Sequence, residues 1–300
     1  MATTETMTSF GYRQSLPCRL RDYYTLTKPE VNLLILITTS AGYYLGSQSG
    51  FRFAGLINTL IGTLLVASGT ATLNQYMERG YDAQMRRTAS RPVASGRMAA
   101  LEAFLFGVVL SVAGGIYLWA TVNSLAAVLA VSTLLSYLLV YTPLKRVTPL
   151  CTLLGAIPGA MPTLIGWAGA SGTLNLQAWF LFAVLFLWQF PHFLAIALMY
   201  REDYARAGYK MLPGFDAEGR FTRAEITAFT IALTAVTLLP VFAAGPSLTY
   251  LLAMGSAGAF FLYYSARLSV TASRGSAKHL VHASVIYLPV VFLIMIVCRP

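Results

Sequence analysis

The sequence predicts an all-α integral membrane protein, and three observations support this fold class. Charged residues make up 11% of the 300 residues and apolar residues 57%, whereas soluble globular proteins carry roughly 25% charged residues. The apolar residues form nine long runs, each near the ~20 residues that a bilayer-spanning helix needs. The cationic residues alternate between connections in the way that a multi-pass protein requires.

The apolar runs also predict the domain organisation, because no polar stretch is long enough for a separate soluble domain. We predict a cytoplasmic N-terminal tail over residues 1–27 and one transmembrane domain over residues 28–300. The tail lacks the apolar core of a secretory signal, and residues 20–26 could lie at the membrane interface. The nine predicted spans are 31–46, 54–73, 101–121, 125–141, 150–170, 178–199, 226–241, 248–265 and 280–297.

The Lys and Arg residues predict the orientation of these spans. Of the 21 cationic residues, all except Arg52 and Arg299 lie before the first span, where Lys28 is the last of them, or in the connections after spans two, four, six and eight. By the positive-inside rule these segments are cytoplasmic, so the N-terminus lies inside and the C-terminus outside. Topology therefore explains most of the net charge of +10 without nucleic-acid binding, and the remaining cations favour an anionic substrate.

The most informative stretch begins where the second span ends. Asn74, Glu78 and Asp82 are spaced i, i+4 and i+8, which places three oxygen-bearing side chains on one stripe of a helix. Acidic groups at a membrane edge are costly unless cations offset them, and Arg86, Arg87 and Arg91 follow within one or two turns. Carboxylate oxygens suit a hard cation, and forked guanidinium donors suit phosphate oxygens. The stretch therefore predicts a Mg²⁺–diphosphate site.

A second acidic patch follows span six and contains Glu202 and Asp203. Taken alone, it is more simply interpreted as a solvated helix end in which the carboxylates pair with Arg201 and Arg206. Together with the first patch, it favours a shared metal site. The two patches lie in connections that are four spans apart, after spans two and six. This spacing suggests a duplicated four-helix unit in which each copy offers one patch.

The histidines differ in their surroundings. His192 follows Pro191 inside span six, and on one continuous helix it would lie about 16 Å from Asp203 along the same wall. An ionisable residue at that depth is a functional candidate. The alternative is a histidine that is hydrogen-bonded to a neighbouring helix or to a carbonyl freed by the proline. His279 and His282 have no accompanying carboxylate and are predicted to be interfacial or packing residues.

The fifth span is unusual because it combines prolines and glycines. Pro158 and Pro162 free backbone carbonyls, while Gly155, Gly159 and Gly166 let a helix or a flat ligand come close. The sequence leaves two interpretations open here, a tight helix-packing face and the lining of a pocket.

Several motifs together resemble the UbiA-type intramembrane prenyltransferases. Within that superfamily, Glu78 and the run that follows it resemble the haem O synthase branch, also called protohaem IX farnesyltransferase. The resemblance covers the whole membrane region, and the departures at Cys151, Thr163 and Phe190 remove no acidic residue. The motifs are Asn74-x-x-x-Glu78-x-x-x-Asp82, Met85-x-Arg87-Thr88-x-x-Arg91-Pro92, Tyr141-Thr142-Pro143-Leu144-Lys145-Arg146, Gly159-Ala160-x-Pro162, Pro191-His192-Phe193 and Asp203-Tyr204-x-x-x-Gly208.

The resemblance implies a single UbiA-type bundle of nine transmembrane helices around a central cavity. It implies transfer of the farnesyl group of farnesyl diphosphate to the 2-vinyl group of haem B, which gives haem O for terminal oxidases, with Mg²⁺ as cofactor. It also implies a bacterial plasma (inner) membrane location rather than a mitochondrial one, and a downstream haem A synthase or oxidase as partner. The implied roles are metal binding by Glu78, Asp82, Glu202 and Asp203, catalysis assisted by Asn74, diphosphate binding by Arg87, Arg91, Lys145 and Arg146, and haem binding by His192.

Two other functions compete with this interpretation. A member of the same superfamily could prenylate an aromatic or quinone precursor, although Glu78 and the deep His192 favour haem. A membrane transporter would also have many spans and intramembrane polar groups. Transporters tend to place charge near the bilayer midplane, whereas the acidic residues here lie at the cytoplasmic ends of the spans.

Overall fold

The computed structural model describes residues 16–48, 50–239 and 247–298, and within these ranges it contains helices and no β-strand. Its short elements are α1 (Leu16–Leu26), α9 (Arg201–Arg206) and a 3₁₀ turn (Leu212–Gly214). Residues 124–144 form one long segment made of α5 (Ser124–Leu135), a π-helical stretch (Ser136–Tyr141) and α6 (Thr142–Leu144). The long helices are α2 (Pro29–Gly46), α3 (Phe53–Asp82), α4 (Ala100–Thr121), α7 (Cys151–Ser171), α8 (Leu176–Met199), α10 (Arg220–Thr237), α11 (Leu248–Thr271) and α12 (Arg274–Val297).

The long helical segments of the described residues correspond one to one with the nine predicted spans. Six of them are long and apolar enough to cross a membrane, namely α3, α4, residues 124–144, α7, α8 and α12. The all-α membrane class is therefore confirmed, whereas the count of nine crossings stays a prediction. The end of the predicted span 226–241 lies outside the described residues.

The exterior of the bundle is apolar, as a lipid-facing surface requires. On α4 the exposed large apolar side chains recur every three or four residues, at Leu105, Val109, Val112 and Ile116. Such a continuous apolar stripe is unusual on the surface of a soluble monomer. The protein is therefore a multi-pass membrane protein.

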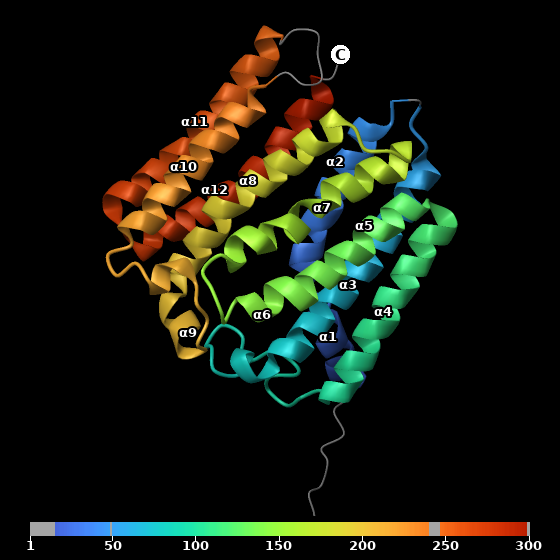
Figure 1. Ribbon diagram of the computed structural model, residues 1–300, viewed down its shortest axis with the longest axis vertical. Helices are drawn as coiled ribbons and strands as arrows, with labels where there is room; N and C mark the ends of the chain where they lie inside the picture. Colours follow the sequence, from blue (N-terminus) through green and yellow to red (C-terminus); the bar gives the residue numbers. More distant parts are fainter. Residues whose placement is uncertain (1–15, 49, 240–246, 299–300) are drawn as a thin grey trace, which may run out of the picture.

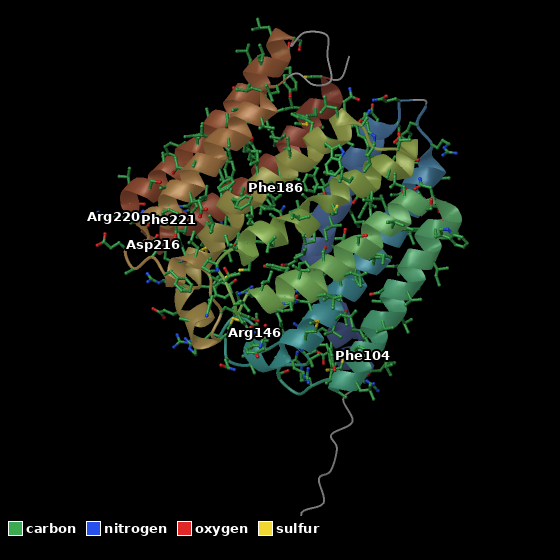
Figure 2. All side chains as sticks on the ribbon, in the orientation of Figure 1. Phe104, Arg146, Phe186, Asp216, Arg220 and Phe221 are labelled. Atoms are coloured by element: carbon green, nitrogen blue, oxygen red, sulfur yellow. The ribbon has the colours of Figure 1, made fainter. Side chains whose placement is uncertain are left out.

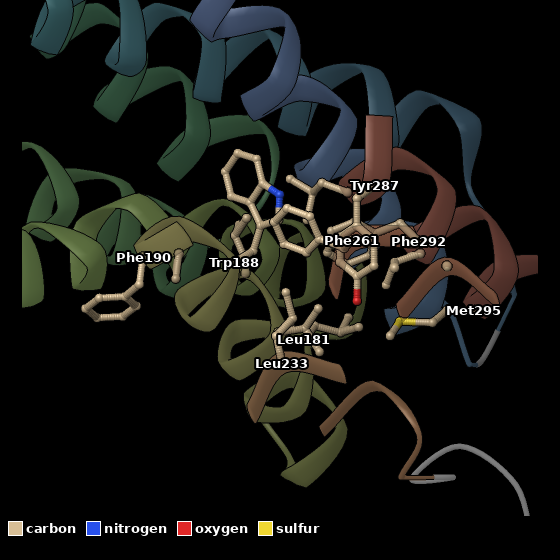
Figure 3. Packing of buried hydrophobic residues seen from close by; sticks show 14 of the residues in the cluster. Leu181, Trp188, Phe190, Leu233, Phe261, Tyr287, Phe292 and Met295 are labelled. Atoms are coloured by element: carbon tan, nitrogen blue, oxygen red, sulfur yellow. The ribbon is translucent and has the colours of Figure 1, made fainter. Parts of the chain in front are cut away.

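The helices form one bundle in which α2 and α7 occupy the middle (Figure 1). α7 contacts α2, α5 and α8, and thereby connects α3, α4 and α5 on one side to α8, α10, α11 and α12 on the other. The latter group packs around a buried apolar core that includes Trp188, Leu233, Phe261 and Tyr287 (Figure 3). The first acidic patch lies at the end of α3 and the second follows α8, and these are the second long helices of successive sets of four.

The glycines of α7 bring it unusually close to its neighbours. A Cβ atom added to Gly166 would lie 2.0 Å from the carbonyl oxygen of Thr39 on α2. A Cβ atom added to Gly159 would lie 1.8 Å from the side-chain oxygen of Gln189 on α8. Both distances are too short for any side chain, so at these two positions the structure favours the packing interpretation of the fifth span.

The functional residues gather at one end of the bundle, which we call the α9 end. It carries α1, the connection 83–99, α9 and the beginning of α12, while α12 finishes at the opposite end (Figure 1). Near this end, Asp216 accepts hydrogen bonds from the backbone N–H of Thr222 at 2.7 Å and from its hydroxyl at 2.9 Å. Asp216 thereby satisfies a free N–H in the first turn of α10 (Figure 2).

Candidate active site

The first acidic patch lies on the last turns of α3, which continues beyond the predicted span as far as Asp82. Asn74, Glu78 and Asp82 are only 1%, 5% and 1% exposed, respectively. They therefore share the face of α3 that points into the protein, as their spacing predicts.

Glu78 is paired with Lys145, which directly follows α6. The Lys145 ammonium donates a hydrogen bond of 2.8 Å to Glu78 Oε1, and both side chains are largely buried. The ring of Tyr141, in the preceding π-helical stretch, lies 4.4 Å from the same ammonium, and such stretches often occur at functional sites. Burial opposes the charge of Lys145, but Tyr141 and the Glu78 carboxylate together outweigh it and raise the pKa of Lys145 well above its ordinary value.

Asp82 is paired with Arg91, which lies in the connection that follows α3. Arg91 Nη1 lies 2.7 Å from each carboxylate oxygen of Asp82. The hydroxyl of Thr88 donates to the main-chain carbonyl of Asp82 at 3.0 Å. The connection therefore folds back over the end of α3 and fixes a guanidinium beside the stripe.

The structure adds Lys28 to this group, a residue whose only role predicted from the sequence was as an orientation signal. Its ammonium donates to Asn74 Oδ1 at 3.1 Å, and the Asn74 amide donates to the Thr142 hydroxyl at 3.2 Å. Burial, reinforced by the nearby charge of Arg91, lowers the pKa of Lys28 to about 7. The available signal was its position directly before Pro29, which is the first residue of α2.

The second acidic patch lies on α9. Asp203 is buried, and its carboxylate lies 3.4 Å from Arg206 Nη1, whereas Glu202 is exposed. The ion pair that the simpler interpretation of this patch predicts is therefore present for Asp203. The ion pair is compatible with a role of Asp203 in metal binding, because the proposed metal ligands of the first patch, Glu78 and Asp82, are also paired with cations.

The segments that carry the two patches contact each other at the α9 end although they are far apart in the sequence. Arg87 Nη2 lies 3.4 Å from the hydroxyl of Tyr204 on α9. The backbone N–H of Lys210 donates to the carbonyl oxygen of Lys145 at 2.7 Å. Met85 forms a small apolar cluster with residues of the segment around α9. These contacts connect α3, the segment after α6 and the segment after α8.

The described residues contain no group of three Asp, Glu, His or Cys side chains close enough to hold a metal ion. The donor set nevertheless fits a hard cation, because the carboxylates of Glu78, Asp82 and Asp203 are buried and their cationic neighbours limit the cost of burial. The Tyr209 hydroxyl is buried beside Glu78, and within the described ranges it makes no hydrogen bond of good geometry, although it lies close enough to interact with the Glu78 carboxylate. An unpaired buried hydroxyl is what a missing ligand would leave. Burial also raises the pKa of Tyr209, which keeps the hydroxyl protonated as a donor.

The four predicted diphosphate contacts all lie at the α9 end. Arg91 and Lys145 are held by the carboxylates of the stripe. Arg146 donates to the hydroxyl of Tyr81 and lies over its ring (Figure 2). Arg87 lies in the connection after α3, where its guanidinium carbon is 5.1 Å from the centre of the Tyr200 ring.

One geometric expectation about the histidines was wrong. Tyr200 has φ of −114° and ψ of 26°, so α8 ends before it and α9 begins after it. His192 and Asp203 therefore do not lie on one continuous helix, because the backbone changes direction between them. His279 and His282 are both exposed on α12.

His192 is held by α12 in one tautomer. Its Nδ1 lies 2.7 Å from the hydroxyl of Ser284, and its ring stacks on Trp188 with centroids 4.7 Å apart. The Ser284 hydroxyl donates its single hydrogen to the carbonyl oxygen of Val281, at 2.6 Å. Nδ1 must therefore carry the proton and donate it to Ser284, which leaves Nε2 with a free lone pair. The predicted hydrogen bond from His192 to a neighbouring helix is therefore present, and Nε2 of the same ring remains available to a ligand.

The sequence is similar to known proteins along most of its length. It matches the UbiA prenyltransferase family over residues 35–288. It is 46% identical over 290 residues to the Protoheme IX farnesyltransferase of Solibacter usitatus, covering 94% of this chain and 99% of that one. It is 41% identical over 297 residues to the protein of the same name from Koribacter versatilis, covering 96% of each chain.

Solved structures show the same fold at low sequence identity. A digeranylgeranylglyceryl phosphate synthase has a TM-score of 0.75 at 20% identity and covers 94% of this chain and 98% of its own. An apo UbiA homologue from Aeropyrum pernix has a TM-score of 0.68 at 21% identity, covering 87% and 97%. A UbiA homologue from Archaeoglobus fulgidus bound to GPP and Mg²⁺ has a TM-score of 0.63 at 15% identity, covering 91% and 99%.

Proposed function

The chain belongs to the UbiA prenyltransferase family, and we propose that it transfers the farnesyl group of farnesyl diphosphate to the 2-vinyl group of haem B. The product is haem O, and the reaction belongs to haem O and haem A synthesis for terminal oxidases. Relatives that share 35–46% of its residues carry the name protoheme IX farnesyltransferase. The observation that carries the proposal is the buried stripe of Asn74, Glu78 and Asp82 surrounded by cations at the same end as Asp203.

Magnesium would be held by Glu78 and Asp82 from α3 and by Glu202 and Asp203 from α9, with Asn74 as a further oxygen donor. A structural neighbour from Archaeoglobus fulgidus that binds GPP together with Mg²⁺ supports this choice of cofactor. When bound, the ion supplies positive charge that stabilises the departing diphosphate.

The cationic side chains of the site would bind the diphosphate. Lys145 and Arg91 lie beside the stripe, and Arg87 and Arg146 lie on the neighbouring connections. Lys28 is a fifth cation, and an arriving diphosphate would favour its charged form against the effect of burial.

These residues would promote the reaction mainly through electrostatics. As the bond between the farnesyl carbon and the diphosphate oxygen breaks, the electron pair leaves with the diphosphate, and the cations neutralise the growing negative charge. The farnesyl carbon becomes an allylic cation, and the π electrons of the haem vinyl group form the new carbon–carbon bond. Water then adds to the cation on the former vinyl group and loses a proton, which completes the hydroxyethyl group. The apolar bundle delays the entry of water until the new bond has formed.

His192 is the proposed haem contact. Its Nε2 carries a free lone pair because Nδ1 donates to Ser284. A neutral imidazole nitrogen whose partner nitrogen is already hydrogen-bonded is the usual form of a histidine that ligates iron.

The orientation in the membrane remains part of the proposal. The cationic connections favour a cytoplasmic α9 end, with the N-terminus inside and the C-terminus outside. The membrane would be the bacterial inner membrane, and a haem A synthase or an oxidase would receive the product.

The proposal is tested by incubating the purified protein with haem B, farnesyl diphosphate and Mg²⁺, followed by mass analysis of the extracted porphyrins. Haem O is the expected product, and omission of Mg²⁺ should prevent its formation. Prenylation of an aromatic or quinone precursor instead of haem, or uptake of a substrate without release of diphosphate, would contradict the proposal.

A further inference from the structure

A cavity of about 490 Å³ opens at the α9 end, between the connection after α3, the end of α8 and the start of α12. Leu198 and Met199 contribute apolar surface to it. Its cationic lining consists of Arg86, Arg87, Arg201 and Arg274, and its acidic lining consists of Glu202 and Asp203.

The lining has an excess of positive charge that its own carboxylates do not neutralise. Four guanidiniums face two carboxylates, which leaves two positive charges. Asp203 is in addition paired with Arg206, which lies outside the lining.

None of the four arginines makes an ion pair within the described ranges of the chain. Arg87 contacts the Tyr204 hydroxyl, Arg201 donates to the carbonyl of Ala217, and Arg274 lies near the Tyr200 ring. The cavity is therefore suited to a ligand that carries two negative charges, and guanidiniums bind carboxylates in a forked geometry.

The cavity lies at the mouth of the seam between α8 and α12, and His192 lies deeper in the same seam. The two helices contact each other. Arg274 lies 5.9 Å from the Tyr200 ring at the mouth, and Ser284 meets His192 farther inside. His192 precedes the end of α8 by seven residues, which corresponds to about 10 Å of helix. His192 is not part of the cavity lining, so a ligand that contacts both the arginines and His192 has to extend from the cavity into the seam between the two helices.

We propose that this cavity binds the two propionate carboxylates of haem B and so orients the porphyrin for farnesyl transfer. The inference rests on the proposed function, because it assigns a binding site to the haem substrate. Arg274 of α12 and Arg86 of the connection after α3 are the anchoring residues, and neither belongs to the proposed diphosphate group. Carboxylates fixed at the mouth hold one edge of the ring there and turn the vinyl groups away from it.

Diphosphate is the other dianion that this chemistry could recognise. The cavity shares Arg87, Glu202 and Asp203 with the proposed diphosphate and metal group. The rest of that group lies along the acidic stripe, where Lys28, Lys145 and Arg91 lie beside Asn74, Glu78 and Asp82, respectively. Arg274 belongs to another helix, and its guanidinium carbon lies 5.9 Å from the centre of the Tyr200 ring. The experiment below distinguishes the two ligands.

The test uses the purified full-length protein in lipid nanodiscs, with haem binding followed by the Soret absorption band. Haem B and its dimethyl ester, in which both carboxylates are blocked, are titrated separately. The unaltered protein should bind haem B at least about tenfold more tightly than the ester, since esterification removes the negative charges that the guanidiniums would bind. Arg86→Gln and Arg274→Gln should each reduce this preference, and the double variant should remove most of it. Arg267→Gln, on an exposed part of α11 outside the cavity, should retain it.

A parallel measurement of KM for farnesyl diphosphate separates the two ligands. If KM for farnesyl diphosphate in Arg86→Gln and in Arg274→Gln stays within about twofold of the value for the unaltered protein, the haem assignment is supported. A twofold change corresponds to a difference in binding free energy of well under 1 kcal/mol. A raised KM for farnesyl diphosphate with an unchanged preference for haem B would overturn it and assign the cavity to diphosphate. Equal binding of haem B and its ester by the unaltered protein would overturn the inference alone. A failure to bind either porphyrin would overturn the proposed function as well.

Discussion

The ammonium of Lys145 and the carboxylate of Glu78 form a buried hydrogen-bonded ion pair of 2.8 Å, although 67 positions separate them in the sequence. The pair joins the segment after α6 to the acidic stripe of α3. It therefore contributes both to the fold, by connecting two helices, and to the site, by holding one cation next to the proposed metal ligands.

The first prediction concerns the energetic role of this pair. Lys145→Met should destabilise the protein by roughly 3–5 kcal/mol, because it leaves a buried carboxylate without its partner. Addition of Glu78→Gln to the same chain should recover most of the stability, because it removes the unpaired charge, but it should not recover activity. Thermal unfolding in detergent and a farnesyl transfer assay measure the two effects. If the single variant were as stable as the unaltered protein, the buried pair would have no energetic role.

The second prediction concerns the metal ligands. Asp82→Asn should lower kcat by at least about 100-fold, because the site loses charge that holds the cation and its diphosphate. The variant should still insert into the membrane. Asp216→Asn is the matched control, since this carboxylate lies near the same end but caps α10, and its kcat should stay close to that of the unaltered protein. Near-normal turnover of Asp82→Asn would remove Asp82 from the metal site.

The comparison of sequence and structure shows which features depend on local patterns. The all-α membrane class and the helical stripe of Asn74, Glu78 and Asp82 could be predicted, because apolar run length and helical spacing are properties of neighbouring residues. Lys28 and Tyr209 were missed, because their place beside the stripe results from the packing of distant segments. The break at Tyr200 was also missed, since no proline or glycine marks it.

The third prediction concerns the tautomer of His192. His192→Ala should weaken haem binding while leaving farnesyl diphosphate binding nearly unchanged. Ser284→Ala should weaken haem binding by about tenfold, as the loss of a hydrogen-bonded partner behind a metal-binding histidine typically does. Ser284→Thr keeps the hydroxyl and should restore binding. The Soret and electron paramagnetic resonance spectra of the haem complex report the iron ligand directly, and identical spectra for Ser284→Ala and the unaltered protein would contradict this role.

The fourth prediction concerns the contact between α2 and α7. Gly166→Ala should destabilise the protein by about 1–3 kcal/mol, since its Cβ atom would meet the backbone of Thr39 and force the helices apart. Gly255→Ala on α11 is the matched control, because no atom lies within 4 Å of the added Cβ. It should be neutral or slightly stabilising, as alanine favours helix by up to about 1 kcal/mol. Equal thermal midpoints for the two variants would contradict the packing role of Gly166.

The central claim is that α3 and α9 contribute ligands to one divalent cation at the α9 end. Mn²⁺ prefers oxygen ligands as Mg²⁺ does, so its binding can be followed by electron paramagnetic resonance in the presence of farnesyl diphosphate. The unaltered protein should bind Mn²⁺, and both Asp82→Asn and Asp203→Asn should lose most of that binding. Retention of full Mn²⁺ affinity by Asp203→Asn would contradict the claim.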